Sequence, residues 1–136
     1  MLRRLCAVIL VACAAASAAA RQVEITILHT TDLHGHVLPT TDYDGRVDVG
    51  GLLRCATLVE RVRAERPNCL LLDCGDLFQG SAESFLTDGR LMTRALEWLR
   101  YDAWILGNHE FDWGLPKLRA LHDATSLPML AANVVG

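Results

Sequence analysis

Short apolar runs alternate with amphipathic segments along this chain of 136 residues. Four runs have the length and the β-branched or continuous apolar character of strands: 23–30, 69–76, 103–106 and 127–135. Three segments between them repeat apolar side chains at helical spacing: 52–66, 89–100 and 115–124. Strands that alternate with helices usually pair in parallel through crossover connections. The sequence therefore predicts an α/β fold with mainly parallel strands and crossover helices.

A hydrophobic leader at residues 1–20 is left out of the predicted fold. It has a basic start (Arg3 and Arg4), an apolar middle and small residues up to Ala20, which is the pattern of a cleaved signal peptide. The letters LVAC that end at Cys13 also resemble a bacterial lipoprotein box, and an uncleaved anchor is a third alternative. We therefore predict an exported domain that is periplasmic, at the cell surface or secreted. A membrane is expected as a partner only if Cys13 is lipidated.

The charge of the chain limits its partners. Removing Arg3 and Arg4 with the leader lowers the formal net charge from −3 to −5. No basic run remains that would attract a nucleic-acid polymer. An anionic substrate would therefore need local positive charge, which bound metal ions could supply.

Three cysteines follow the leader, at Cys55, Cys69 and Cys74. Their odd number argues against a closed disulfide framework, although one bridge remains open. We predict that they behave as small buried apolar residues.

Polar clusters follow the first three predicted strands. The letters TDLHGH follow the first strand, CGDLFQGS the second and GNHEFDWG the third. The carboxyl ends of parallel strands lie at one edge of a sheet, where ligand sites form in open α/β folds. Gathering so many ionisable groups in one crevice is costly without a compensating ion. The sequence therefore predicts a metal-dependent site at this edge.

The side chains in these clusters suit metal binding and proton transfer. Asp32 and His34 are separated by one residue on chain that is expected to remain extended, so both would project to the same side and could share a metal ion. The carboxylate of Asp76 could bridge two cations, although a turn or a helix cap explains it equally well. Asn108 offers a neutral amide oxygen, and His109 can donate a proton.

The three clusters together resemble the calcineurin-like metallophosphoesterases, which have D-x-H, G-D and G-N-H-[ED] in this order. The longer strings ILHTTDLHGH, GDLFQGS and LGNHEFDWG are similar to the exported 5'-nucleotidase and 2',3'-cyclic phosphodiesterase branch. The resemblance covers residues 23–134. It implies an αββα sandwich, of which residues 21–136 would be the N-terminal part.

The resemblance also implies roles for six residues. Asp32 and His34 would bind the first metal, Asp76 both metals and Asn108 the second. His109 would be the catalytic imidazole, and Asp112 would orient it. Two divalent ions (Zn, Mn, Fe, Co or Ca) roughly 4 Å apart would activate a water for in-line hydroxide attack on a nucleotide or a related phosphate ester. For Glu110 a supporting or solvent-exposed position is favoured over direct chemistry.

The resemblance is incomplete, because the family has further metal-binding histidines in later G-H and G-H-x-H motifs. His29, His36 and His122 do not have that context. We therefore expect the chain to be a fragment that binds metal weakly and has negligible activity alone. Two alternatives remain open, a metal-binding or interaction module without turnover and a related thiohydrolase of the same branch. The sequence does not indicate the oligomeric state.

Overall fold

The computed structural model describes residues 22–134, so the predicted leader and Cys13 lie outside the described residues. Its elements in chain order are β1 (Thr26–Thr30), α2 (Leu52–Glu65), β2 (Cys69–Asp73), α3 (Ala82–Leu86), α4 (Arg90–Leu99), β3 (Ala103–Ile105), the short 3-10 helix η1 (His109–Phe111), α5 (Leu115–Asp123) and β4 (Met129–Leu130). Every predicted strand and helix is present. The strands are shorter than predicted: β1 begins only at Thr26, β2 and β3 end where the polar loops begin, and β4 is limited to Met129–Leu130.

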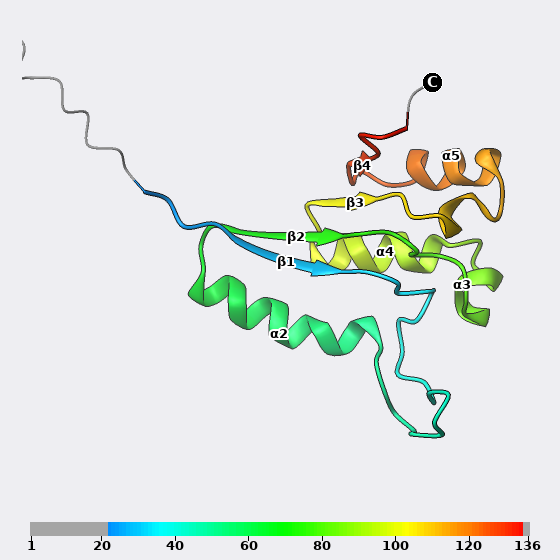
Figure 1. Ribbon diagram of the computed structural model, residues 1–136, viewed down its shortest axis with the longest axis horizontal. Coiled ribbons are helices and arrows are strands. Elements are labelled where there is room, and N and C mark those ends of the chain that lie inside the picture. Colours follow the sequence, from blue (N-terminus) through cyan, green and yellow to red (C-terminus); the bar gives the residue numbers. More distant parts are fainter. Residues whose placement is uncertain (1–21, 135–136) are drawn as a thin grey trace, which may run out of the picture.

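The four strands form one parallel sheet in the order β1, β2, β3, β4. Thr30 pairs with Asp73, Asp73 with Trp104 and Trp104 with Met129, so the last residues of the first two strands lie side by side. The predicted α/β fold with parallel strands and crossover helices is confirmed. Figure 1 shows the loops that follow β1, β2 and β3 leaving the sheet at the same end.

The ends of the helices follow local rules. Helix α2 stops before Pro67, where Arg66 adopts an extended conformation. Helix α4 ends at Arg100 in the left-handed conformation, with a φ of 57°. The short helix α3 was not predicted, and the Oγ of Ser81 caps it by accepting the N–H of Ser84 at 3.1 Å.

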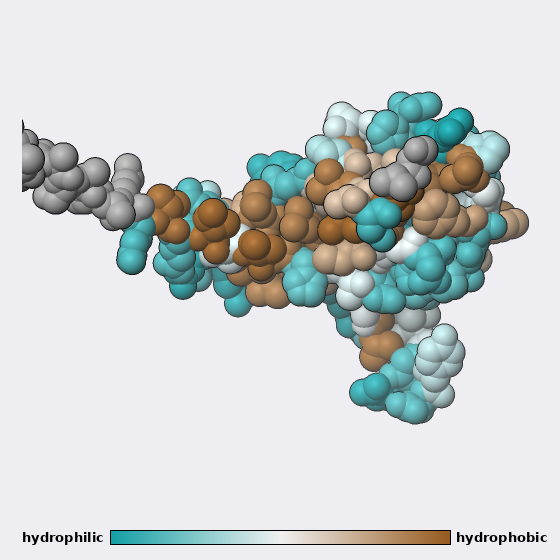
Figure 2. Space-filling view, turned by 45° about the horizontal axis from the view of Figure 1, so that its top comes forward, coloured by the Kyte–Doolittle hydropathy of each residue, from teal (hydrophilic) through white to brown (hydrophobic). Residues whose placement is uncertain are grey.

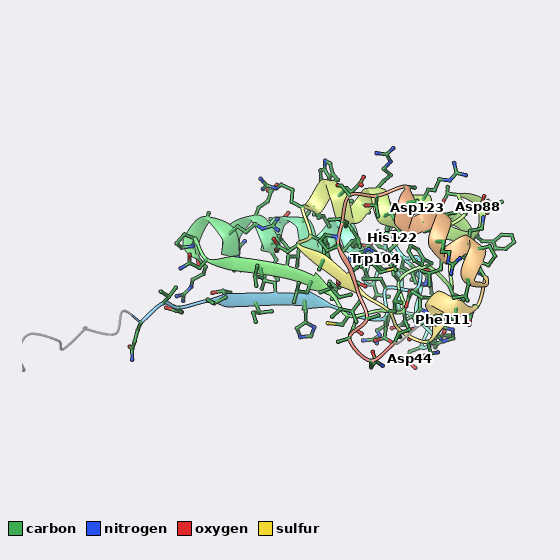
Figure 3. All side chains as sticks on the ribbon, turned by 90° about the horizontal axis from the view of Figure 1, so that it is seen from above. Asp44, Asp88, Trp104, Phe111, His122 and Asp123 are labelled. Carbon is green, nitrogen blue, oxygen red and sulfur yellow. The ribbon has the colours of Figure 1, made fainter. Side chains whose placement is uncertain are left out.

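Helices α2, α4 and α5 lie on the same face of the sheet, where each contributes buried residues to one core (Figure 3). Each strand is followed in the sheet by the next strand of the chain, so the chain always moves across the sheet in the same direction. Because crossovers between parallel strands are right-handed, their helices then lie on one face. The core between the sheet and the helices includes Leu71 of β2, Leu96 of α4 and Leu121 of α5. Trp104 of β3, labelled in Figure 3, is fully buried there. Its ring is edge-on to that of Phe78, with centroids 5.3 Å apart.

The other face of the sheet is open among the described residues. Ile27 is 59% exposed, Leu70 is 40% exposed and Leu130 is 48% exposed, and all three are apolar. Figure 2 shows such apolar side chains gathered along this side of the molecule. The continuous apolar run of β2 predicted a strand covered on both faces, but residues 22–134 cover only one. They form one sheet and one helix layer.

The burial of the cysteines differs from the prediction. The three cysteines within residues 22–134 are free. Cys55 and Cys69 are only partly buried and Cys74 is exposed, so full burial is not observed for the first two and the predicted burial of Cys74 is wrong. Cys74 is exposed because it directly follows the end of β2, where the polar loop begins. Within residues 22–134, no helix has both the length and the apolar character that crossing a membrane requires.

Candidate metal centre

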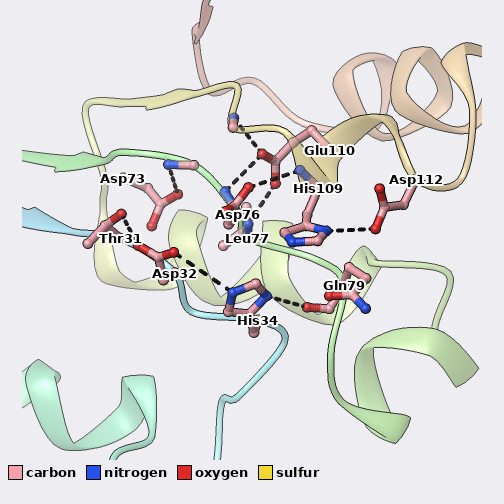
Figure 4. Close-up of polar contacts among 12 residues, drawn as sticks. Thr31, Asp32, His34, Asp73, Asp76, Leu77, Gln79, His109, Glu110 and Asp112 are labelled. Carbon is pink, nitrogen blue, oxygen red and sulfur yellow. Dashed lines mark hydrogen bonds and ion pairs between the residues drawn. The ribbon is translucent and has the colours of Figure 1, made fainter.

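The loops after β1 and β2 run side by side beyond the ends of the strands. The N–H of Asp32 donates to the carbonyl of Gly75 at 3.0 Å, and the N–H of His34 donates to the carbonyl of Asp76 at 2.9 Å. These backbone hydrogen bonds extend the pairing of the two strands by several residues. As a result, side chains more than forty residues apart in the sequence share one edge of the sheet (Figure 4).

Asp32, His34 and Asp76 form a compact group that could hold a metal ion. One ligand atom from each lies within 4.8 Å of the other two. The Nδ1 of His34 donates to the backbone carbonyl of Gln79 at 2.8 Å, which leaves Nε2 unprotonated in the neutral ring and free to bind metal. This Nε2 lies 3.8 Å from Oδ1 of Asp32.

The backbone at this group differs from the prediction. Asp32, His34 and Asp76 have φ values of 54°, 46° and 57°, in the left-handed region, so the chain at Asp32 and His34 is not extended. Their side chains meet because the loop turns, and the simple alternation of an extended strand does not apply. Left-handed backbone at residues with a Cβ is strained and clusters at functional sites.

His109 and Asp112 lie on the third loop, beside this group. The Nδ1 of His109 is 2.7 Å from Oδ2 of Asp112, across one turn of η1. The hydrogen bond to Asp112 raises the pKa of His109, so the ring stays protonated to higher pH than usual. The rings of His34 and His109 meet edge to face with centroids 5.3 Å apart, and this contact places His109 next to the metal-binding group.

Asn108, the fourth predicted ligand, directly precedes η1 and is exposed. Among the described residues, no side-chain hydrogen bond ties its amide to the other candidates, unlike its neighbour His109. Its backbone is fixed, because the next N–H, that of His109, donates to Oδ1 of Asp76 at 2.9 Å. The structure therefore brings the Asn108 backbone to the site and leaves its side chain at the surface.

Glu110 is buried, with only 3% of its surface exposed, so a solvent-exposed position is wrong. Its carboxylate accepts backbone N–H groups from Asp76, Leu77 and Gly107. Glycine is required where these loops cross, because a Cβ on Gly107 would lie 2.3 Å from Oδ1 of Asp76. The G-D and G-N motifs thus allow the two loops to approach at van der Waals distance.

Comparison with known proteins identifies the group of proteins to which this site belongs. The profile of the calcineurin-like phosphoesterase family matches residues 25–133, which include every candidate side chain. The chain belongs to this family.

Individual members of the calcineurin-like phosphoesterase family are similar over most of the chain. A snake venom 5'-nucleotidase from Crotalus adamanteus is 42% identical over 127 residues, which cover 90% of this chain and 22% of that protein. A 5'-nucleotidase precursor from Thermus thermophilus has a similar crystal structure, with a TM-score of 0.71 and 37% sequence identity. The match covers 80% of this chain and 22% of that one. The chain thus spans about a fifth of the length of these relatives.

A sulfate thiohydrolase from Thermus thermophilus has a similar structure, with a TM-score of 0.70 over 82% of this chain and 30% of that one, but only 18% identity. Identity this low shows a shared fold alone. The thiohydrolase alternative therefore gains no support beyond the fold.

The donor set fits the divalent ions of a phosphoesterase. Two carboxylates and one imidazole nitrogen combine the oxygen ligands that suit Mn²⁺ with the nitrogen ligand that suits Zn²⁺ or Fe²⁺. The carbonyl of Gln79 and the N–H of His109 orient two of these ligands from behind. Neither orienting group was identified from the sequence, because each acts through its backbone and carries no side-chain signal.

Asp73 is a second buried carboxylate that the sequence did not single out. It is fully buried and accepts hydrogen bonds from Oγ1 of Thr30 at 2.7 Å and from the N–H of Gly75 at 3.1 Å. The Oγ1 of Thr30 also contacts the hydroxyl of Tyr101 at 2.9 Å. Burial raises the pKa of Asp73 to about 6, and the nearby charges of Glu110 and Asp32 add to this effect.

Replacing Asp73 by asparagine is expected to stabilise the metal-free protein increasingly as the pH rises. The pKa of Asp73 is about 6 in the folded protein, above the usual 3.8. Protonated Asp73 therefore contributes its full share to the free energy of unfolding below pH 4, and this contribution is lost as the pH rises through 6. Asparagine does not titrate. The free energy of unfolding of Asp73→Asn, relative to that of the unaltered protein, should therefore increase by about 2–3 kcal/mol between pH 4 and pH 7. Urea unfolding in EDTA at several pH values measures this difference. The control Val59→Ala changes no ionisable group, so its loss in the free energy of unfolding should be the same at every pH. A difference between Asp73→Asn and the unaltered protein that does not change with pH would contradict the assignment.

Proposed function

We propose that the chain is the N-terminal part of a metal-dependent phosphohydrolase acting on nucleotides or related phosphate esters. The observation that carries this proposal is the convergence of Asp32, His34 and Asp76 with the His109–Asp112 pair at one edge of the sheet. The named activities of the 42% and 37% identical relatives, both 5'-nucleotidases, support the choice of nucleotides.

Each side chain has a distinct proposed role. Asp32 and His34 would hold the first metal, Asp76 would contribute to both, and Asn108 would hold the second through its amide oxygen. Two bound divalent ions would neutralise phosphate oxygens and lower the pKa of the attacking water. Protonated His109, held by Asp112, faces the phosphoryl group and stabilises the negative charge that develops there.

The open face of the sheet supports a larger catalytic domain. Exposed apolar side chains on neighbouring strands, among them Ile27, Leu70 and Leu130, form the kind of patch that another layer of structure normally covers. We propose that a second sheet with its own helices packs here and brings the remaining metal-binding histidines to the site. Weak metal binding and negligible activity are then expected from residues 21–136 alone.

We also propose that the protein is exported. The signal-like residues 1–20 carry this proposal, and similarity to a venom protein supports it. Lipidation at Cys13 remains the alternative that would place the protein at a membrane.

Chelation tests the proposed function in a polypeptide that carries this chain together with the rest of the domain. EDTA should abolish hydrolysis of AMP and of a chromogenic phosphodiester, and added Mn²⁺, Co²⁺ or Zn²⁺ should restore it, because the reacting water depends on the ions. The readouts are released phosphate and released chromophore. Undiminished hydrolysis in EDTA would contradict the metal-dependent mechanism, and metal binding without any hydrolysis would favour the module without turnover.

A further inference from the structure

Glu110 makes an unusual set of contacts for a buried acidic residue. It lies in η1 between His109 and Phe111, and only 3% of its surface is exposed. No lysine or arginine pairs with it among the described contacts. Its three hydrogen-bond partners are all backbone N–H groups. A buried carboxylate is costly unless such donors satisfy it.

These donors come from two different loops. Oε1 accepts the N–H of Leu77 at 2.6 Å, and Oε2 accepts the N–H of Asp76 at 2.9 Å, both from the loop after β2. Oε2 also accepts the N–H of Gly107 at 2.6 Å, from the loop after β3. One carboxylate therefore ties together the loops that carry Asp76 and His109 (Figure 4).

The contact also explains the backbone at Asp76. This residue has a φ of 57°, which disfavours a residue with a Cβ. The turn directs the two successive N–H groups of Asp76 and Leu77 to one point, the arrangement that forms an anion-binding nest. Glu110 is the anion in this nest, and it stabilises the conformation that aims the Asp76 carboxylate at the cluster.

The two loops hold each other reciprocally. Glu110 binds the backbone of Asp76, while Oδ1 of Asp76 binds the N–H of His109 at 2.9 Å. The separation between Asp76 and His109 thus depends on contacts in both directions. Loosening either contact would let a metal ligand and the catalytic imidazole move apart.

We propose that Glu110 is a positioning residue that fixes the Asp76 carboxylate and His109 relative to one another through the backbone of both loops. The expected effect on metal binding rests on the proposed function. The hold of Glu110 on the two loops does not depend on any metal. Charge and shape both matter. In Glu110→Gln, an N–H₂ group replaces one acceptor oxygen and faces a backbone donor, so the nest loses at least one hydrogen bond.

Amide hydrogen exchange tests the structural part in the metal-free chain. In Glu110→Gln, the amides of Asp76, Leu77 and Gly107 should exchange at least tenfold faster, relative to amides within β2, than in the control Val59→Ala. Val59 is a buried core residue of α2, so its truncation lowers global stability without touching either loop. If Glu110→Gln does not fold, Glu110→Asp provides the same comparison, because the shorter acid cannot reach all three donors. Equal relative exchange at these amides in the Glu110 variant and the control would overturn the proposal.

Cobalt binding tests the consequence for the metal centre. In the polypeptide that carries this chain together with the rest of the domain, titration with Co²⁺ followed by visible absorption should show roughly 10–100-fold weaker binding in Glu110→Gln than in Val59→Ala. Supporting residues have effects of this size on metal affinity. Equal affinity in the two variants would overturn the positioning role. If the unaltered protein with the whole domain gave no Co²⁺ spectrum while the exchange result held, the metal assignment would be wrong and the hold of Glu110 on the two loops would stand.

Discussion

Replacing His109 by alanine is expected to lower kcat for nucleotide hydrolysis by roughly 10²–10⁴-fold, the usual contribution of a positioned acid or base. The reason is geometric, because His109 lies edge-on to His34 at 5.3 Å and is held by Asp112 at 2.7 Å. The rates of AMP hydrolysis should be compared in the metal-loaded protein that contains the whole domain. Metal content should stay near that of the unaltered protein, since His109 is not a proposed ligand.

Asp112→Asn keeps the imidazole of His109 but removes the charge of the carboxylate that holds it. The hydrogen bond to Asp112 raises the pKa of His109, so removing the charge should lower that pKa. Activity that needs the protonated ring should then decline at lower pH than in the unaltered protein. Asp123→Asn, which removes an exposed acid at the end of α5, is the matched control and should leave the pH profile unchanged. An undiminished kcat in His109→Ala would disprove the catalytic role, whatever the effect of Asp112→Asn.

Replacing Trp104 by alanine should have the largest effect on stability, with a loss of about 3–5 kcal/mol in the free energy of unfolding. Trp104 of β3 is fully buried in the core that also contains residues of α4 and α5, and its ring packs against Phe78. Truncation would leave a cavity in this core. Urea unfolding followed by circular dichroism measures the loss.

Trp98 provides a control of the same residue type. It lies on α4 with 66% of its surface exposed, so Trp98→Ala should change the free energy of unfolding by no more than about 0.5 kcal/mol. Trp104→Phe should retain most of the stability, because the buried Nε1 of Trp104 has no hydrogen-bond partner among the described residues. Similar losses for Trp98→Ala and Trp104→Ala would show that the core does not form around Trp104.

Much of the fold could be predicted because it depends on local patterns. The apolar spacing of residues 52–66 predicted α2 to within one residue of its observed end at Glu65. The apolar run from Cys69 predicted the start of β2. Helix α3 was missed because its five residues are too short to show a helical period. Its start depends on a cap from Ser81, a feature common to turns as well as helices.

The sequence predicted which loops form the candidate site, but it did not predict their backbone conformation. Parallel strand ends explain why the loops of Asp32, Asp76 and His109 meet, and the structure brings these residues together. The extended chain expected at Asp32 and His34 is wrong, because tertiary hydrogen bonds to the neighbouring loop hold both residues in the left-handed region. Asn108 was placed on the correct loop, and its role as a ligand stays a prediction.

The sequence by itself determined the order of strands and helices, the edge of the sheet at which the polar motifs gather and the family resemblance that these motifs carry. Only the tertiary structure decided the contacts of Glu110 and the environment of Asp73. Glu110 contacts backbone groups 33 and 34 residues away, and Asp73 contacts a threonine 43 residues away. Periodicity and spacing describe neighbours along the chain, whereas burial, pKa and loop position depend on residues that become neighbours only when the chain folds.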